Sequence, residues 1–256
     1  MLAFLSYWQY SLVVKVYATR EHFIYNTLNT TIMLETILRL VAPHECIGCN
    51  SEGALLCGDC QGQLAAAPGY CYRCLRPTSD GGAVCAACLP HIPLTAVHAA
   101  TKYHGTVKDI IWKLKFAGAQ AATKELAKMM ATQLRASYPA GGEAMLVHAP
   151  TATSHIRQRG YDQAQLLARH LSKQTGVRYV PVLARLTQTH QIGATRQQRR
   201  AQLAEAFRVR TPLLVKNAHI ILVDDVLTTG STLEAAAEVL KAAGARRVDA
   251  LVFAQA

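Results

Sequence analysis

Apolar positions after residue 94 follow two alternating spacings. Short apolar runs predict β-strands at 95–103, 144–149, 178–183, 219–223 and 247–253. Between these runs, apolar residues recur every three or four positions, which predicts helices at 107–116, 121–138, 155–175 and 231–243. The run HIILV at 219–223 is of the kind that lies buried in a parallel sheet. Alternation of the two kinds of element predicts an α/β domain, a parallel sheet flanked by helices.

Two segments depart from this alternation. Residues 1–32 are rich in aromatic residues and threonine, show no clear period, and are expected to form a poorly defined N-terminal extension. Residues 188–200 are polar and lack an apolar period, which predicts a mobile loop.

No stretch of the chain reaches the ~18 uninterrupted apolar residues of a membrane span. The first eighteen residues are apolar but lack the basic start and the cleavage site of a secretory signal. A cytoplasmic location is therefore expected.

The composition indicates a folded protein, and the distribution of charge predicts that the protein binds anions. The hydrophobic fraction of 51% is typical of a folded globular protein and not of a disordered one. The chain carries 27 Lys and Arg against 16 Asp and Glu, a net charge of +11. Residues 153–210 alone hold eleven basic and two acidic residues, so this segment has a net charge of +9. Such a segment attracts nucleotides, sugar phosphates or nucleic acid, and the alternative is a solvated basic face.

All eight cysteines lie between residues 46 and 88, in four CxxC pairs. Each pair can present two thiolates from a tight turn, and two pairs make a tetrahedral zinc site. The pairs are Cys46 and Cys49, Cys57 and Cys60, Cys71 and Cys74, and Cys85 and Cys88. A disulfide framework would need an oxidising compartment, which no secretion signal supports, so two structural zinc ions are predicted. Pairing of neighbouring CxxC pairs closes the shortest loops, and a crossed pairing stays open.

The cysteine-rich stretch offers too little apolar surface for a core of its own. It is therefore predicted to be a separate module at residues 33–93, followed by the α/β domain at 94–256. Its Tyr72, Arg73 and Arg76 are expected to pack against the protein rather than to contact a partner.

The most informative segment runs from the strand at 219–223 into a hydroxyl-rich turn and a helix. Ligands of open α/β sheets bind at the carboxyl ends of the strands, where this segment places Asp224 and Asp225. Backbone amides of the turn can converge on a phosphate, and Gly230 lets the chain curl close to it. The expected phosphate-binding residues are Val226, Leu227, Thr228, Thr229, Gly230, Ser231 and Thr232. Ser231 and Glu234 have the spacing of a capping box, which predicts a helix start near Ser231.

The two carboxylates suit neighbouring ribose hydroxyls or a metal-bound sugar. The alternative is an ordinary strand–turn–helix with acidic residues near the helix start. The full run D-D-x-x-T-T-G-x-T after a buried strand favours the functional interpretation.

This run resembles the 5-phosphoribosyl-1-diphosphate (PRPP) signature of type I phosphoribosyltransferases. Four CxxC pairs precede it, as do KLKFAG at 113–118 and RQRGYDQA at 157–164. In this order, the elements resemble the ComF family over residues 33–254. The resemblance implies a type I phosphoribosyltransferase-like sheet behind an N-terminal double zinc ribbon.

Residue by residue, the resemblance implies that Asp224 and Asp225 hold the ribose hydroxyls. The turn with Pro150 and Thr151 would sit where the family keeps its pyrophosphate loop. The diphosphate or another anion would also be contacted by Lys115, Arg157 and Arg159.

As partners and cofactors, the resemblance implies PRPP or ribose 5-phosphate with Mg²⁺. It also implies single-stranded DNA and the helicase machinery of DNA uptake in competence.

Two departures from the family pattern stand beside the expected anion site. The chain reads Val147-His-Ala-Pro150 where relatives read V-P-[IV]-P, and Tyr161-Asp162 where they commonly have Phe-Asn. The second departure adds a carboxylate to the expected anion site. Two functions therefore stay open: a PRPP-binding protein of DNA uptake, and a phosphoribosyltransferase whose acceptor the sequence does not identify.

Overall fold

The computed structural model describes residues 45–67, 69–78, 82–138, 143–186 and 206–256. The chain divides into two units, residues 1–46 with 50–54 and residues 47–49 with 55–256. In the described part of the first unit, the Cys46 amide donates to the Ser51 carbonyl at 2.7 Å and Glu45 forms a bridge to Glu52. The predicted extension at 1–32 and loop at 188–200 lie outside the described residues, and the predicted domain boundaries stay a prediction.

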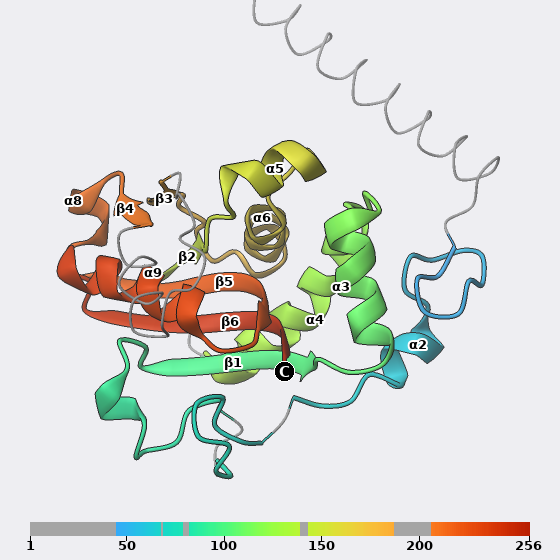
Figure 1. The fold of residues 1–256 in the computed structure, drawn as a ribbon, viewed down its shortest axis with the longest axis horizontal. Helices are drawn as coiled ribbons and strands as arrows, with labels where there is room; N and C mark the ends of the chain where they lie inside the picture. The colour runs from blue at the N-terminus through green and yellow to red at the C-terminus, as the bar shows by residue number, and fades with distance from the viewer. Residues whose placement is uncertain (1–44, 68, 79–81, 139–142, 187–205) are drawn as a thin grey trace, which may run out of the picture. The chain divides into compact units, whose positions relative to one another are not determined.

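A four-stranded parallel sheet forms the centre of the second unit (Figure 1). Its order is β1 (Ala96–Lys102), β6 (Arg247–Gln255), β5 (His219–Leu227) and β2 (Ala144–His148). Strands β5 and β6 are buried along almost their whole length, as their continuous apolar runs predict. Because the strands are parallel, the carboxyl ends of β2 and β5 meet at one edge of the sheet.

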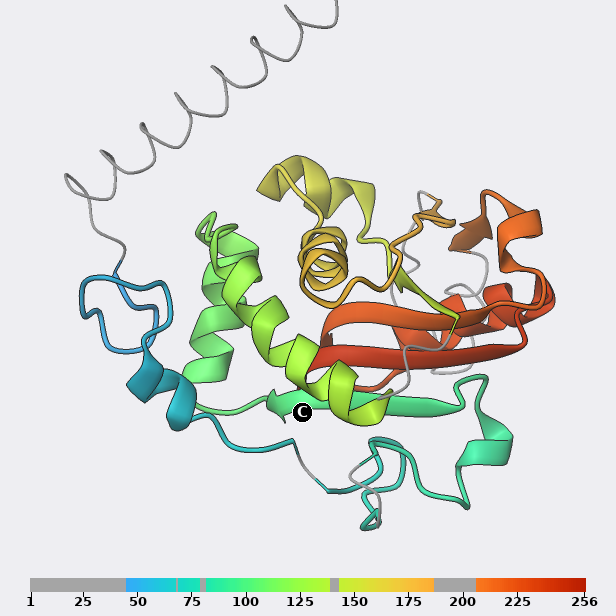
Figure 2. The same ribbon diagram turned by 180° about the vertical axis from the view of Figure 1, so that it is seen from behind.

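Helices cover both faces of this sheet (Figure 2). Helices α4 (Ala122–Ser137) and α6 (Gln163–Thr175) pack together on one face, and α9 (Ser231–Ala242) packs on the opposite one. The remaining elements are α2 (Gly58–Gly62), η1 (Leu89–His91), α3 (Thr106–Phe116), α5 (Thr153–Arg159), α8 (Pro212–Val215) and the antiparallel pair β3 (Leu183–Arg185) and β4 (Phe207–Val209). The predicted α/β class, a parallel sheet with flanking helices, is confirmed.

The single helix predicted at 155–175 is wrong, because α5 and α6 are separate helices. Gly160 ends α5 with a φ of +82°, in the left-handed region that glycine adopts at low cost. Asp162 then starts α6 by accepting a hydrogen bond from the Gln165 amide. The apolar period belongs to α6, whereas α5 has a single apolar residue, Ile156, and no buried residue, so the period did not reveal where one helix ends and the next begins.

Two predicted strands also differ from the observed ones. The strand predicted at 178–183 is reduced to one bridge between Tyr179 and Leu146, and β3 begins only at Leu183. Strand β5 continues past Val223 to Leu227, so Asp224 and Asp225 lie inside the strand and not after it. Pairing with β6 extends to Leu227, and this pairing outweighs the poor strand propensity of aspartate.

A buried charge cluster stands at the opposite, amino-terminal edge of the sheet. The fully buried Asp249 carboxylate accepts hydrogen bonds from Tyr138 Oη and His219 Nε2, both at 2.7 Å, and from Arg247 Nε at 2.8 Å. Burial raises the pKa of Asp249, but these three donors outweigh burial and hold it below its ordinary value. The stability that ionised Asp249 contributes is therefore fully present above the pKa that Asp249 has in the unfolded chain. It is lost as the pH falls through the lower pKa that Asp249 has in the folded protein.

No helix within the described ranges is long and apolar enough to span a membrane.

Candidate functional site

Two groups of four cysteine thiols can each hold a metal ion. The first group is Cys46, Cys49, Cys57 and Cys60, and the second is Cys71, Cys74, Cys85 and Cys88. Within each group the sulfur atoms lie within 4.8 Å of one another, as the ligands of one tetrahedral zinc ion must. CxxC pairs that are neighbours in the sequence thus share a site, and the crossed pairing is wrong.

Both groups begin with the same kind of turn. The amides of Asn50 and Leu75 donate to the carbonyls of Cys46 and Cys71, four residues earlier, and both donor residues have a φ near +60°. Burial raises the pKa of the Cys71 thiol, but backbone hydrogen bonds around it outweigh burial and lower the pKa to about 6. A thiol of this kind is a thiolate at neutral pH, the form that binds zinc. The residues present therefore fit two structural zinc ions.

At the carboxyl edge of the sheet, β5 ends in a turn with unused donors, in which Thr228 and Thr229 are exposed and Gly230 is buried. Within the described part of the chain, the amides of Thr228, Thr229, Gly230 and Thr232 donate to no acceptor. Gly230 is the N-cap of α9 with a φ of +77°, so these amides lie at the positive end of a twelve-residue helix. Val226 and Leu227 belong to the ladder with β6, so the predicted phosphate turn begins at Thr228.

The two acidic residues before this turn have different surroundings. Asp225 is buried and its Oδ2 lies 2.9 Å from Lys115 Nζ, in an ion pair that the sequence did not predict. Asp224 is less buried, and its Oδ1 accepts the Asp225 amide at 2.8 Å. Burial and the neighbouring charge of Asp225 raise the pKa of Asp224 well above its ordinary value. The site thus holds a carboxyl group that a cation or a hydroxyl-bearing ligand would favour in its ionised form.

The two arginines predicted to bind an anion, Arg157 and Arg159, lie on α5, and only Arg159 contacts the end of α3 next to Lys115. Arg159 stacks its guanidinium over the Phe116 ring, with the Cζ atom 5.3 Å from the ring centroid. Tyr161 donates a hydrogen bond to the Leu114 carbonyl, which fixes the end of α5 against the end of α3. Arg157 is exposed. Lys115 follows Leu114 directly, so the contact between α5 and α3 brings Arg159 and Lys115 to the same edge of the sheet.

The turn after β2 lies beside Asp224, because the Ala149 amide donates to the Val223 carbonyl at 2.9 Å. The Thr151 amide and hydroxyl of this turn donate to Asp162, at 2.9 and 3.2 Å. A cavity of about 380 Å³ opens next to them, lined among others by His148, Arg185 and Arg210. The pKa of the buried His148 is lowered by burial, so its imidazole is neutral at neutral pH.

The second cysteine group contacts the turn after β5, a contact that the sequence did not reveal. Tyr72 Oη donates to Glu234 Oε1 at 2.9 Å, and Arg73 Nη1 lies 3.4 Å from the same oxygen. The predicted packing role is therefore confirmed for the buried Tyr72, whereas Arg73 and Arg76 are exposed and their packing stays a prediction. The predicted capping box is wrong, because the side chain of Glu234 serves this contact and Ser231 is the first helical residue instead of the cap. A motif search could not find the contact, since Tyr72 and Glu234 are 162 residues apart.

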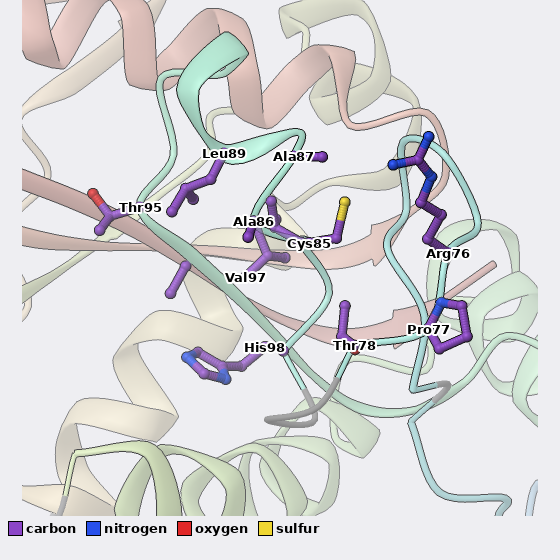
Figure 3. A pocket seen from close by; sticks show the side chains of 13 residues that line it. Arg76, Pro77, Thr78, Cys85, Ala86, Ala87, Leu89, Thr95, Val97 and His98 are labelled. Atoms are coloured by element: carbon purple, nitrogen blue, oxygen red, sulfur yellow. The ribbon is translucent and has the colours of Figure 1, made fainter.

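A second, larger cavity lies away from this edge (Figure 3). It has a volume of about 470 Å³ and lies between the segment 76–89 and the start of β1 at residues 95–98. Because the start of β1 is at the amino-terminal edge of the parallel sheet, this cavity does not belong to the site around β5.

Gly230 offers a direct test of the contact between Tyr72 and the turn. An added Cβ would meet Tyr72 Cε2 at 2.2 Å, and a non-glycine residue in the left-handed region costs about 1–2 kcal/mol by itself. We expect Gly230→Ala to lower the free energy of unfolding by more than this strain, because the ring must also move. In a double-mutant cycle measured by urea unfolding, Tyr72→Ala should remove the excess and leave only the strain. Additive losses would contradict the contact.

Sequence similarity agrees with this two-part arrangement. Residues 156–256 match the Phosphoribosyl transferase domain family, and residues 37–89 match the Double zinc ribbon domain family. The chain is 26% identical to the DNA utilization protein YhgH of Salmonella typhimurium and to that of Escherichia coli K12. It is 28% identical to Competence protein F of Haemophilus influenzae. Each of these alignments covers 82% of this chain and 96% of the relative. A double zinc ribbon, a phosphoribosyltransferase domain and these relatives together confirm the resemblance to the ComF family.

Proposed function

We propose that the turn after β5 binds the 5-phosphate of a phosphorylated ribose, such as ribose 5-phosphate or PRPP. The observation that carries this proposal is the set of unused amides at Thr228, Thr229, Gly230 and Thr232, at the start of α9. Convergent amides at a helix N-terminus are a common phosphate site. Asp224 and Asp225 lie on β5 shortly before the turn, where their oxygens can accept hydrogen bonds from the ribose hydroxyls.

A magnesium ion belongs to this proposal, because Mg²⁺ prefers carboxylate, phosphate and water oxygens. It would neutralise ligand charge beside the two aspartates. Asp224 is the better candidate to face it, since Lys115 already neutralises Asp225.

Isothermal titration calorimetry of the purified protein in Mg²⁺ buffer tests the proposal. Ribose 5-phosphate should bind, whereas ribose and inorganic phosphate alone should bind at least about tenfold more weakly, a loss of about 1.4 kcal/mol or more. Equal affinity for ribose 5-phosphate and inorganic phosphate would show that the sugar is not recognised and would contradict the proposal.

We further propose that the protein acts on DNA, as the names of its relatives indicate for those proteins. A surface on α3 supports this role. Trp112 and Phe116 lie one turn apart, are 58% and 57% exposed, and have ring centroids 6.0 Å apart. Lys108 lies one turn before Trp112, and Arg159 covers the Phe116 ring. Exposed aromatic rings between cationic side chains are suited to stacking the bases of a single strand.

Replacing both rings by alanine tests this surface. Each stacked base contributes about 1–3 kcal/mol, so Trp112→Ala with Phe116→Ala should weaken binding of a labelled oligothymidylate at least about tenfold. Leu213→Ala removes a large exposed apolar side chain elsewhere and is the matched control. Fluorescence anisotropy at several salt concentrations measures the change. Equal losses in the double variant and in the control would rule out the α3 surface.

The alternative function is phosphoribosyl transfer from PRPP to an unidentified acceptor. The 380 Å³ cavity beside Thr151 favours this alternative, because it is large enough for a small cyclic acceptor. Release of pyrophosphate from PRPP in the presence of a nucleobase would establish it.

A further inference from the structure

In the turn after β2, the hydrogen-bond donors of Thr151 already bind a carboxylate of the protein itself, that of Asp162. The Asp162 carboxylate accepts hydrogen bonds from the Thr151 amide at 2.9 Å, the Thr151 hydroxyl at 3.2 Å and the Gln165 amide at 3.1 Å. Asp162 is 8% exposed. One buried carboxylate therefore takes the backbone donor and the hydroxyl donor of the turn, together with an amide at the start of α6.

These donors are of the type that a diphosphate would need in this position. Phosphate oxygens are bound in proteins by backbone amides, hydroxyl groups and helix N-termini. The turn adjoins the proposed ribose site, since Ala149 is hydrogen-bonded to Val223, the residue before Asp224. A group on the anomeric carbon of the ribose would thus lie next to the Thr151 turn. The Thr151 amide and hydroxyl would not be free to bind this group, because both already donate to Asp162.

The charges around the cavity also disfavour a second anion beside Asp162. Asp162 is the one acidic residue among the described residues that line it, and Arg185 and Arg210 are its two arginines. Arg185 stacks on the Phe207 ring, with Cζ 5.3 Å from the ring centroid, and is half-buried. Burial lowers the pKa of Arg185, and the charges of Asp224 and Asp162 oppose this shift. Asp162 therefore offsets positive charge that would otherwise be available to an anionic ligand.

We propose that Asp162 is a specificity residue that directs the site toward a ribose 5-phosphate group and away from a 1-diphosphate. This inference rests on the ribose phosphate site proposed above. A diphosphate would have to displace the carboxylate from Thr151 or stand beside its negative charge. The preferred ligands then carry a ribose 5-phosphate group without the 1-diphosphate.

Two substitutions separate the charge of Asp162 from its role at the start of α6. Asp162→Asn removes the charge and keeps the shape. Asp162→Ser also keeps a good helix cap but is too short to reach Thr151. The measured quantity is the ratio of the dissociation constant of ribose 5-phosphate to that of PRPP, obtained by calorimetry at one Mg²⁺ concentration.

We expect the wild-type ratio to lie below one, and both variants to raise it at least about tenfold, as the release of one charge-assisted contact implies. A purely structural defect would weaken the binding of both ligands and leave the ratio of their dissociation constants unchanged. Zinc content and thermal unfolding confirm that each variant is folded.

Three outcomes are distinguishable. A wild-type protein that prefers PRPP tenfold or more overturns the role of Asp162, as does an unchanged ratio in both variants, while ribose phosphate binding itself stands. A wild-type protein that binds neither ligand overturns the proposed site, and the role of Asp162 falls with it.

Discussion

Replacing Asp224 and Asp225 together by asparagine is expected to weaken the binding of ribose 5-phosphate about 100-fold or more. Each carboxylate would lose a charge-assisted hydrogen bond to a ribose hydroxyl, and such bonds contribute about 1.5–3 kcal/mol each. Calorimetry with the purified double variant measures the loss. The amides of the turn remain in this variant, so residual binding should resemble that of inorganic phosphate.

A stability measurement separates a binding role from a structural one. The pKa of Asp224 is raised by burial and by the charge of Asp225, so its ionised form is unfavourable in the unliganded protein. Asp224→Asn alone should therefore leave the thermal midpoint unchanged or raise it at pH 8. Lower stability together with unchanged affinity would assign Asp224 to the fold and not to the ligand.

A charge-matched control completes this experiment. Asp59 and Asp109 are exposed acidic residues on α2 and α3. Their replacement by asparagine changes the net charge by the same amount as the double substitution at 224 and 225. If the control weakens binding equally, a general change of electrostatic potential explains the result and the site does not.

Loss of the second metal site is expected to lower both the zinc content and the stability of the protein strongly. Cys71→Ser removes one of the four thiols of the second group, and we expect the zinc content to fall from two ions per chain to one. Zinc binding to such ribbons is coupled to folding and contributes on the order of 10 kcal/mol in isolated fingers, so the segment 69–89 should lose its structure. Metal analysis and urea unfolding measure both changes.

The two zinc sites should differ in their effect on the ligand. Tyr72 follows Cys71 directly and contacts Glu234 and the Gly230 turn. Cys71→Ser should therefore weaken ribose 5-phosphate binding as well as stability. Cys46→Ser is the matched variant, because it removes one zinc ligand from the other group, and we expect it to weaken ligand binding less. A wild-type zinc content near zero would contradict both metal sites.

The sequence predicted most helices and strands of the sheet to within a few residues, and its failures have physical reasons. The break between α5 and α6 depends on the conformation of Gly160 and on the cap at Asp162, which periodicity does not detect. The extension of β5 to Leu227 depends on hydrogen bonding to β6, a strand that lies twenty residues further along the chain.

The candidate site was predictable in part. The turn and the two aspartates follow one another in the chain, so their relation was visible without a structure. Lys115 was expected to face an anionic ligand, whereas the structure pairs it with Asp225. Thr151 was expected to contact the diphosphate, whereas Asp162 takes its donors. In both cases a side chain of the protein takes a contact that the motif had suggested for a ligand.

By itself, the sequence determined the strand–turn–helix around Asp224 and the presence of four CxxC pairs, because both depend on the spacing of neighbouring residues. Only the tertiary structure decided which pairs share a metal ion, that Tyr72 supports the Gly230 turn, and that Asp162 closes the Thr151 turn. The reason is that local spacing fixes backbone geometry over a few residues, whereas these contacts depend on which side chains the packing of distant segments brings within reach.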